Sequence, residues 1–70
     1  MRRLSFLVNQ GENNSFMVHG LEWAAYAEGK SWVATTLAIR QSVKNSFAES
    51  ERPEFLDFRF PDGSVISLSA

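Results

Sequence analysis

The sequence predicts an α+β domain of two layers, in which one helix lies on a mainly antiparallel sheet. Two patterns lead to this prediction. Apolar residues alternate with a period of two over residues 3–9 and 54–60, as in half-buried strands, and recur at steps of three and four over residues 32–48, as in an amphipathic helix. We therefore expect a single domain over residues 1–70, with elements in the order β-β-β-α-β and optionally a last β.

The first two strands are expected at residues 3–9 and 16–19. Alternation in the first strand places its apolar side chains on one face, and these are Leu4, Phe6 and Val8. Leu7 lies on the other face, and in the second strand Met17 and His19 lie opposite Phe16 and Val18. Residues 10–15 hold Gly11 and two asparagines, which tolerate positive φ angles and predict a hairpin loop.

A third strand is expected at residues 23–27, after a turn at residues 20–22. The helix follows, with Ser31 as its N-cap, because the serine hydroxyl can accept a hydrogen bond from a free N–H in the first turn. One apolar stripe marks the buried side of this helix, and it consists of Trp32, Thr36, Ile39, Val43 and Phe47. Val33 and Leu37 are one turn apart and lie outside this stripe.

The end of the helix and the last strands are marked by prolines and a glycine. Pro53 stops the helix, because proline cannot continue an α-helical hydrogen-bond pattern. Residues 54–60 then alternate, with Phe55 on the face opposite Leu56 and Phe58. The sequence PDG at residues 61–63 predicts a turn, and residues 65–68 can return as a short strand with Ile66 and Leu68 inward.

Composition and charge argue against several classes of function. The net charge is −1 and the seven basic residues are scattered, whereas nucleic-acid binding usually needs a basic stripe. There is no cysteine for a disulfide or a thiolate metal site, and no apolar run approaches the ~20 residues of a membrane span. Arg2 and Arg3 precede only a short apolar stretch, so we expect no signal peptide and a cytoplasmic protein.

The chain resembles the N-terminal domain of HicB-type antitoxins, and most closely the short stand-alone HicB-like proteins of bacteria. The similarity runs over about residues 3–68. It rests on fold-forming positions, namely Phe6, Leu7, Val8, Gly20, Ala27, Glu28, Ile39, Val43, Phe47 and the pair Arg52–Pro53. The resemblance implies a partial ribonuclease-H-like fold that lacks the catalytic acidic residues of true ribonucleases.

The resemblance also implies a partner. In complete antitoxins this domain masks a small basic toxin that cleaves RNA, and a separate C-terminal module binds the operator. No counterpart of that module is expected in this chain. Many HicB domains have a Pro-Asp-Leu-Pro-Gly type turn after the second strand, where this sequence reads His19-Gly20-Leu21-Glu22-Trp23, so toxin recognition through that turn is not carried over.

His19 is the only histidine, and it could suggest an active site. A catalytic histidine needs an orienting acid and a nucleophile or metal within reach, but Glu12 and Glu22 stand at no recognised spacing from it. No second histidine or cysteine exists to complete a zinc site. We therefore expect no catalytic residue, no metal site and no cofactor, and we interpret His19 as an ordinary strand residue.

The apolar residues outside the predicted core indicate an interaction surface. One helix covers one face of the sheet, and the other face is then expected to carry Leu7, Met17, His19, Trp23 and Phe55. With Val33 and Leu37, these residues form the candidate interface, although loops or the last strand could cover part of it. Self-association as a homodimer is its simplest use.

Three classes of function are compatible with the sequence. The first is a non-enzymatic HicB-like protein that acts by association, as an antitoxin-type inhibitor or an orphan relative. The second is a structural or regulatory homo-oligomer with no toxin partner. The third, a nucleic-acid-binding module, is opposed by the near-neutral charge.

Overall fold

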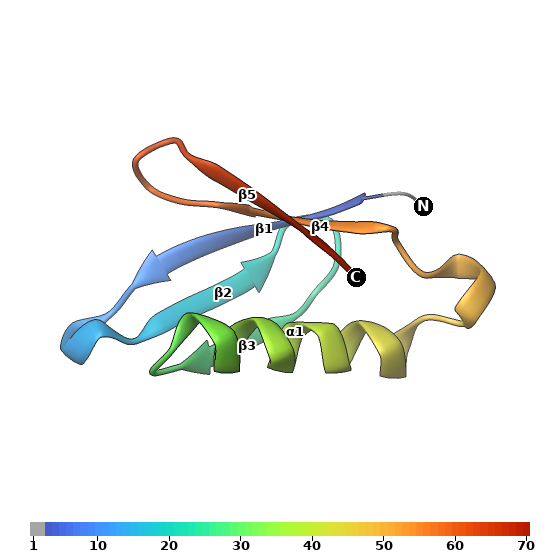
Figure 1. Cartoon of the computed structure of the whole chain (residues 1–70), viewed down its shortest axis with the longest axis horizontal. Coiled ribbons are helices and arrows are strands. Elements are labelled where there is room, and N and C mark those ends of the chain that lie inside the picture. Colours follow the sequence, from blue (N-terminus) through green and yellow to red (C-terminus); the bar gives the residue numbers. More distant parts are fainter. Residues whose placement is uncertain (1–2) are drawn as a thin grey trace.

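The computed structural model describes residues 3–70 and shows one helix lying on one face of a five-stranded sheet (Figure 1). Two short 3-10 turns, at Glu12–Asn14 and Glu49–Glu51, join these elements. The strands and the helix are β1 (Arg3–Gln10), β2 (Phe16–Gly20), β3 (Tyr26–Gly29), α1 (Trp32–Ser46), β4 (Phe55–Arg59) and β5 (Val65–Ser69). Of the Arg2–Arg3 pair considered above, Arg2 lies outside the described residues.

The sheet has the strand order β3-β2-β1-β4-β5. The neighbours β1 and β4 run parallel, and the other three neighbouring pairs run antiparallel. The predicted α+β class, the single helix and the mainly antiparallel sheet are therefore confirmed. The chain also forms the optional last strand, so the order is β-β-β-α-β-β.

The two faces of the sheet differ as the alternation predicted. Residues that point toward α1 form the core, whose fully buried members on the strands are Leu4, Phe6, Val8, Val18, Leu56 and Phe58.

In the loop before β2, Asn13 and Asn14 have φ angles of 61° and 60°, which asparagine tolerates better than most residues. The predicted hairpin loop is thus present, with its 3-10 turn as an addition.

The third strand was predicted wrongly at residues 23–27. β3 begins only at Tyr26, because the backbone N–H of Gly20 donates a hydrogen bond to the carbonyl oxygen of Ala25 (2.9 Å) and closes residues 21–24 into a loop. This loop needs a glycine, since a Cβ atom at position 20 would lie 2.0 Å from the carbonyl oxygen of Trp23. The loop also directs Trp23 to the side of α1, where its ring packs edge-on against Phe47 with 5.0 Å between centroids.

α1 begins at Trp32 with Ser31 as its N-cap, as expected, and the Ser31 hydroxyl accepts a hydrogen bond from the N–H of Ala34 (3.1 Å). The helix ends at Ser46, and the guanidinium of Arg52 donates to the carbonyl oxygens of Lys44 and Phe47 near that end. Thr35 is buried although it lies outside the predicted stripe. It packs against Gly29 of β3, where a Cβ atom would lie 2.5 Å from the Thr35 hydroxyl.

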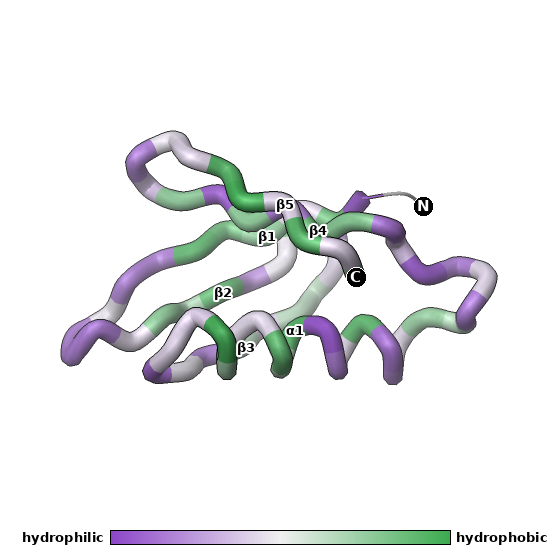
Figure 2. The backbone as a smooth tube through the Cα atoms, in the orientation of Figure 1, coloured by the Kyte–Doolittle hydropathy of each residue, from purple (hydrophilic) through white to green (hydrophobic). Residues whose placement is uncertain are grey.

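α1 covers the sheet unevenly. It packs on β3 and β2, while Trp32 reaches from its first turn to Phe58 and Phe60 at the end of β4, with ring centroids 5.1 and 5.3 Å apart. β5 lies at the far edge of the sheet from β3, and hydrophobic stretches alternate along it with paler ones (Figure 2). Ile66 of β5 lies directly opposite Phe58, so its side chain points to the helix side of the sheet as that of Phe58 does. Ile66 is nevertheless 40% exposed.

Candidate functional site

The face of the sheet opposite α1, called the open face below, carries a row of side chains that crosses all five strands. The register places them side by side in the order Tyr26, His19, Leu7, Arg59 and Val65. Tyr26 and Val65 are exposed, at 61% and 49%, while Leu7 and His19 are half-buried. No hydrogen bond or ion pair joins the side chain of His19 to another residue within the described range.

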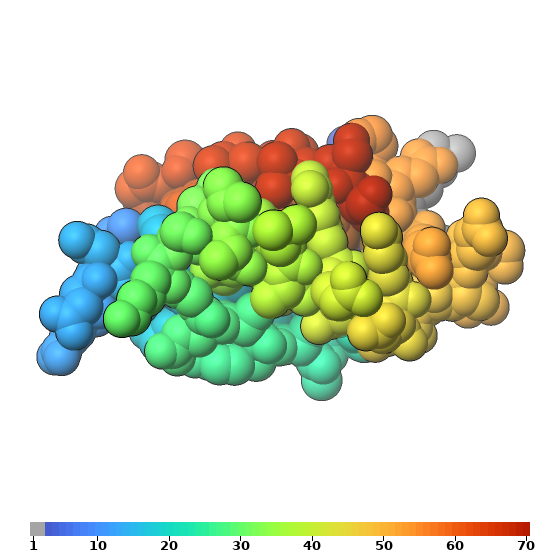
Figure 3. Space-filling view, turned by 60° about the horizontal axis from the view of Figure 1, so that its bottom comes forward, coloured from blue at the N-terminus to red at the C-terminus, as the bar shows by residue number. Residues whose placement is uncertain are grey.

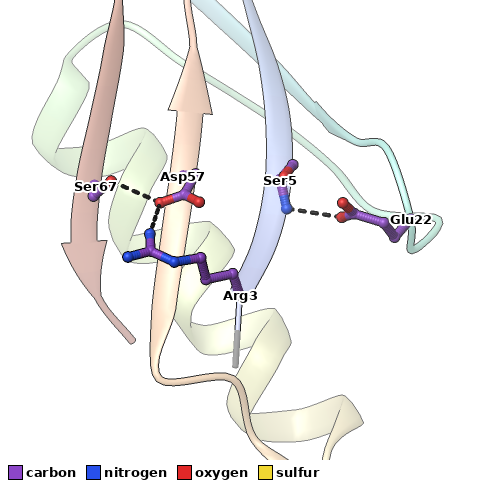
Figure 4. A network of polar contacts seen from close by, with 5 residues as sticks. All are labelled: Arg3, Ser5, Glu22, Asp57 and Ser67. Carbon is purple, nitrogen blue, oxygen red and sulfur yellow. Dashed lines mark hydrogen bonds and ion pairs between the residues drawn. The ribbon is translucent and has the colours of Figure 1, made fainter. Parts of the chain in front are cut away.

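A polar network occupies the open face beside this row (Figure 4). The Asp57 carboxylate accepts hydrogen bonds from the Ser67 hydroxyl (2.6 Å) and from Nη1 of Arg3 (2.8 Å), so it links β4 to β5 and to β1. The Ser67 bond, with help from Arg3, holds the pKa of Asp57 below its ordinary value of 3.8, although burial opposes this shift. Arg3 also lies over the ring of Phe55, 4.8 Å from its centroid, and forms a cation–π contact.

Glu22, which Figure 4 shows beside Ser5, has a structural role because it binds the backbone of β1. Its Oε2 atom accepts a hydrogen bond of 2.8 Å from the backbone N–H of Ser5, and the N–H of Leu21 donates to the Ser5 carbonyl oxygen. These bonds continue the pairing of β1 beyond Gly20, where β2 ends. Glu22 is therefore engaged by the backbone, and it is not placed as an acid that orients His19.

A second polar pair lies on the outer edge of the sheet. The Tyr26 hydroxyl donates a hydrogen bond of 2.8 Å to Oε2 of Glu28, on the same face of β3. This bond and the nearby negative charge raise the pKa of Tyr26 above its ordinary value of 10.0.

Glu28 also lines a shallow polar hollow with Glu12, Asn13, Ser15, Gly29 and Lys30. Among residues 3–70 no group of three or more histidine, cysteine, aspartate or glutamate side chains could hold a metal ion.

The residues proposed for the interface separate in the structure. Leu7, Met17, His19 and Phe55 do lie on the open face, but charged side chains are placed among them and Arg3 covers the Phe55 ring. Trp23 was placed on this face wrongly, since it packs against the core on the helix side. The open face is therefore a mixed surface, not a continuous apolar one.

On the helix side of the molecule α1 borders β5 (Figure 3), and exposed apolar residues of both elements lie there. Val33 and Leu37 of α1 are 66% and 56% exposed, and Ile66 of β5 is 40% exposed. Residues step about 100° around a helix, so Val33 and Leu37 lie on the side of α1 away from Thr35, which contacts β3, and hence on the side that faces β5. We call Val33, Leu37 and Ile66 the α1–β5 surface.

The sequence indicated part of this surface. Val33 and Leu37 stand out from the buried stripe by periodicity alone, and their exposure agrees with that reading. Ile66 was expected to point inward, and it does face the helix side. Its exposure follows from the position of α1 over β2 and β3, which no local pattern in the sequence reports.

No family model, curated protein or solved structure matches the chain. In residues 3–70 the single α-helix is too short and too polar to cross a membrane.

Proposed function

We propose that the chain is a non-enzymatic protein-binding domain that acts by covering a surface of its partner. The observation that carries this proposal is the α1–β5 surface, where three large aliphatic side chains are exposed between one helix and an edge strand. Exposed apolar residues that gather on one side of a domain mark interaction sites, because their burial in a complex removes apolar area from water.

The particular role proposed is that of a HicB-like, antitoxin-type inhibitor or an orphan relative of one, with the partial ribonuclease-H-like fold that this implies. The resemblance of residues 3–68 and the observed order of strands and helix support it. The partner would be a small basic RNA-cleaving toxin, and the mechanism would be occlusion of the toxin without covalent chemistry. The carboxylates of the exposed turn Glu49–Glu51 would suit a basic partner, since opposite charges speed association.

The alternative is a structural or regulatory homo-oligomer with no toxin partner. The observation that favours it is β5, whose sequence VISLS carries no charge although it forms an edge of the sheet. Edge strands usually carry charges or prolines that prevent pairing with another chain.

The experiment is a pull-down of the tagged chain from its native cells, with mass spectrometry of the recovered proteins. We expect a small basic protein in near-equal amount, lost with Leu37→Glu and retained with Ala38→Glu. Both positions are exposed on α1, but a helical step of about 100° turns Ala38 away from the α1–β5 surface. Recovery of untagged copies alone would support the homo-oligomer instead, and equal loss with both variants would show that the α1–β5 surface is not the binding site.

A further inference from the structure

The outer edge of β5 carries backbone groups that no neighbouring strand of the sheet pairs. Hydrogen bonds join Phe60 to Ser64 and Ala70 to Glu54, on either side of the β4–β5 ladder. Because bonding alternates along an antiparallel pair, Ile66 and Leu68 direct their N–H and C=O groups to β4. Val65, Ser67 and Ser69 therefore direct theirs to the free edge.

β5 differs from the opposite edge of the sheet in how it is protected. β3 carries the charged Glu28 and packs against α1, both of which discourage pairing with another strand. β5 has no charged residue and no proline, and α1 packs mainly on β3 and β2 at the other side of the sheet. Of the two edges, β5 is therefore the one open to strand addition.

The pattern of β5 is complementary to itself. In an antiparallel pair of two β5 strands centred on Ser67, Val65 lies opposite Ser69 of the second copy and Ile66 opposite Leu68. The residues with free N–H and C=O groups then face each other, and three such pairs exchange about six backbone hydrogen bonds. Ile66 and Leu68 of both copies fall on the same face, because directly opposed residues share a face in an antiparallel pair.

This register also continues the core across the two copies. Ile66 lies opposite Phe58 within one sheet, and Leu68 lies opposite Leu56. On the helix side the side chains would thus follow one another in an unbroken apolar row: Phe58, Ile66, and then Leu68 and Leu56 of the second copy. A shift of the register by one residue would put the helices on opposite faces and leave Ile66 against a polar surface.

We propose that β5 pairs antiparallel with β5 of a second copy of this chain, about a two-fold axis at Ser67, to form one continuous ten-stranded sheet. This inference deepens the homo-oligomer named above. Of the α1–β5 surface the dimer uses Ile66, and it leaves Val33 and Leu37 of α1 uncovered. α1 packs mainly on β3 and β2, which lie farther from the shared edge than β4 and β5, so Leu37 lies outside the paired strands and remains accessible to another protein.

The test is the mass of the full chain by light scattering over a dilution series, together with amide hydrogen exchange. We expect twice the 7.9 kDa of one chain, and slow exchange at Val65, Ser67 and Ser69 that becomes fast on dilution. A monomeric mass overturns the proposal. A dimeric mass with fast exchange at these three amides also overturns it, because the dimer would then use another surface.

Two variants make the test specific. Ile66→Lys should raise the dissociation constant at least about 100-fold, because it places two unpaired ammonium groups in the shared apolar row. Tyr26→Lys, an exposed position on the other edge strand, should leave the dimer intact. Circular dichroism checks that each variant is folded, and the exchange of the unmodified chain decides the matter if Ile66→Lys does not fold.

The outcomes also separate this inference from the toxin-binding proposal. A monomer that still captures a basic protein through Leu37 would overturn the β5 dimer alone. A β5 dimer that captures no other protein would overturn the toxin partner alone.

Discussion

The rings of Phe6 and Phe58 stack with 5.2 Å between their centroids and 20° between their planes. The two residues lie directly opposite each other on β1 and β4, the parallel pair of the sheet. Both are fully buried, and Trp32 of α1 packs edge-on against Phe58. This contact therefore joins the beginning of the chain, its helix and its last hairpin in one cluster.

Phe58→Leu should destabilise the fold by about 1–2 kcal/mol, because the smaller side chain loses the contacts to both neighbouring rings and leaves space in the core. Chemical denaturation measures the change in the free energy of unfolding. Phe55→Leu is the matched control on the other face of β4, and it should cost less than about 1 kcal/mol, chiefly through the lost contact with Arg3. Equal costs at the two positions would contradict the assignment of faces.

Much of this fold could be predicted from local patterns in the sequence. Alternation assigned Leu4, Phe6 and Val8 to the core, and Ser31 marked the start of the helix. The third strand was misplaced because Trp23 and the alanines after it fit a strand by composition. The bond from Gly20 to Ala25, which makes this segment a loop, leaves no mark in the periodicity.

The candidate site was predicted less well, for a physical reason. Exposure of Val33 and Leu37 depends only on their helix, whereas exposure of Ile66 depends on which strands α1 covers. Arg3 lies over Phe55 because β1 and β4 are neighbours, and these residues are far apart in the chain. Relationships between distant segments decide which apolar residues remain accessible, and one sequence does not show them.

Gly20→Ala should destabilise the fold by about 1–3 kcal/mol, because the added Cβ would meet the backbone carbonyl oxygen of Trp23, which cannot move without opening the loop. Thermal unfolding followed by circular dichroism measures the change. Gly11→Ala is the control, since its added Cβ would meet only the ends of the Ser15 and Met17 side chains. A loss of less than about 0.5 kcal/mol is expected there, because flexible side chains can move aside.

Asp57 should make stability depend on pH in the acid range. Its pKa is lower in the folded chain than the ordinary value of 3.8, so its carboxylate contributes stability that is fully present above the unfolded pKa. This contribution is lost as the pH falls through the lowered pKa of the folded state. The Asp57→Asn variant should therefore be less stable than the unmodified chain near neutral pH. The difference in their free energies of unfolding should become smaller as the pH falls below about 4.

The cause of that shift can be tested separately by carboxyl NMR titration. Ser67→Ala removes the hydrogen bond that contributes most, so the pKa of Asp57 should rise toward its ordinary value. Asp62 is an internal control, because its pKa is lowered by Ser64 in the turn between β4 and β5 and does not depend on Ser67. An unchanged Asp57 titration in this variant would assign the shift to Arg3.

Trp23 and Leu37 should respond to substitution in opposite ways. Trp23→Ala removes a ring that packs against Phe47 beside the core, so it should lower the free energy of unfolding by about 2–3 kcal/mol. As long as the Trp23→Ala variant is folded, it should capture the protein partner as the unmodified chain does. Leu37→Glu changes an exposed side chain, so its effect on stability should stay within about 0.5 kcal/mol while capture of a protein partner is lost. Denaturation and pull-down on the same two variants measure both properties. If the Trp23→Ala variant kept its stability but no longer captured its partner, the binding site would include the loop at residues 21–25 and not the α1–β5 surface alone.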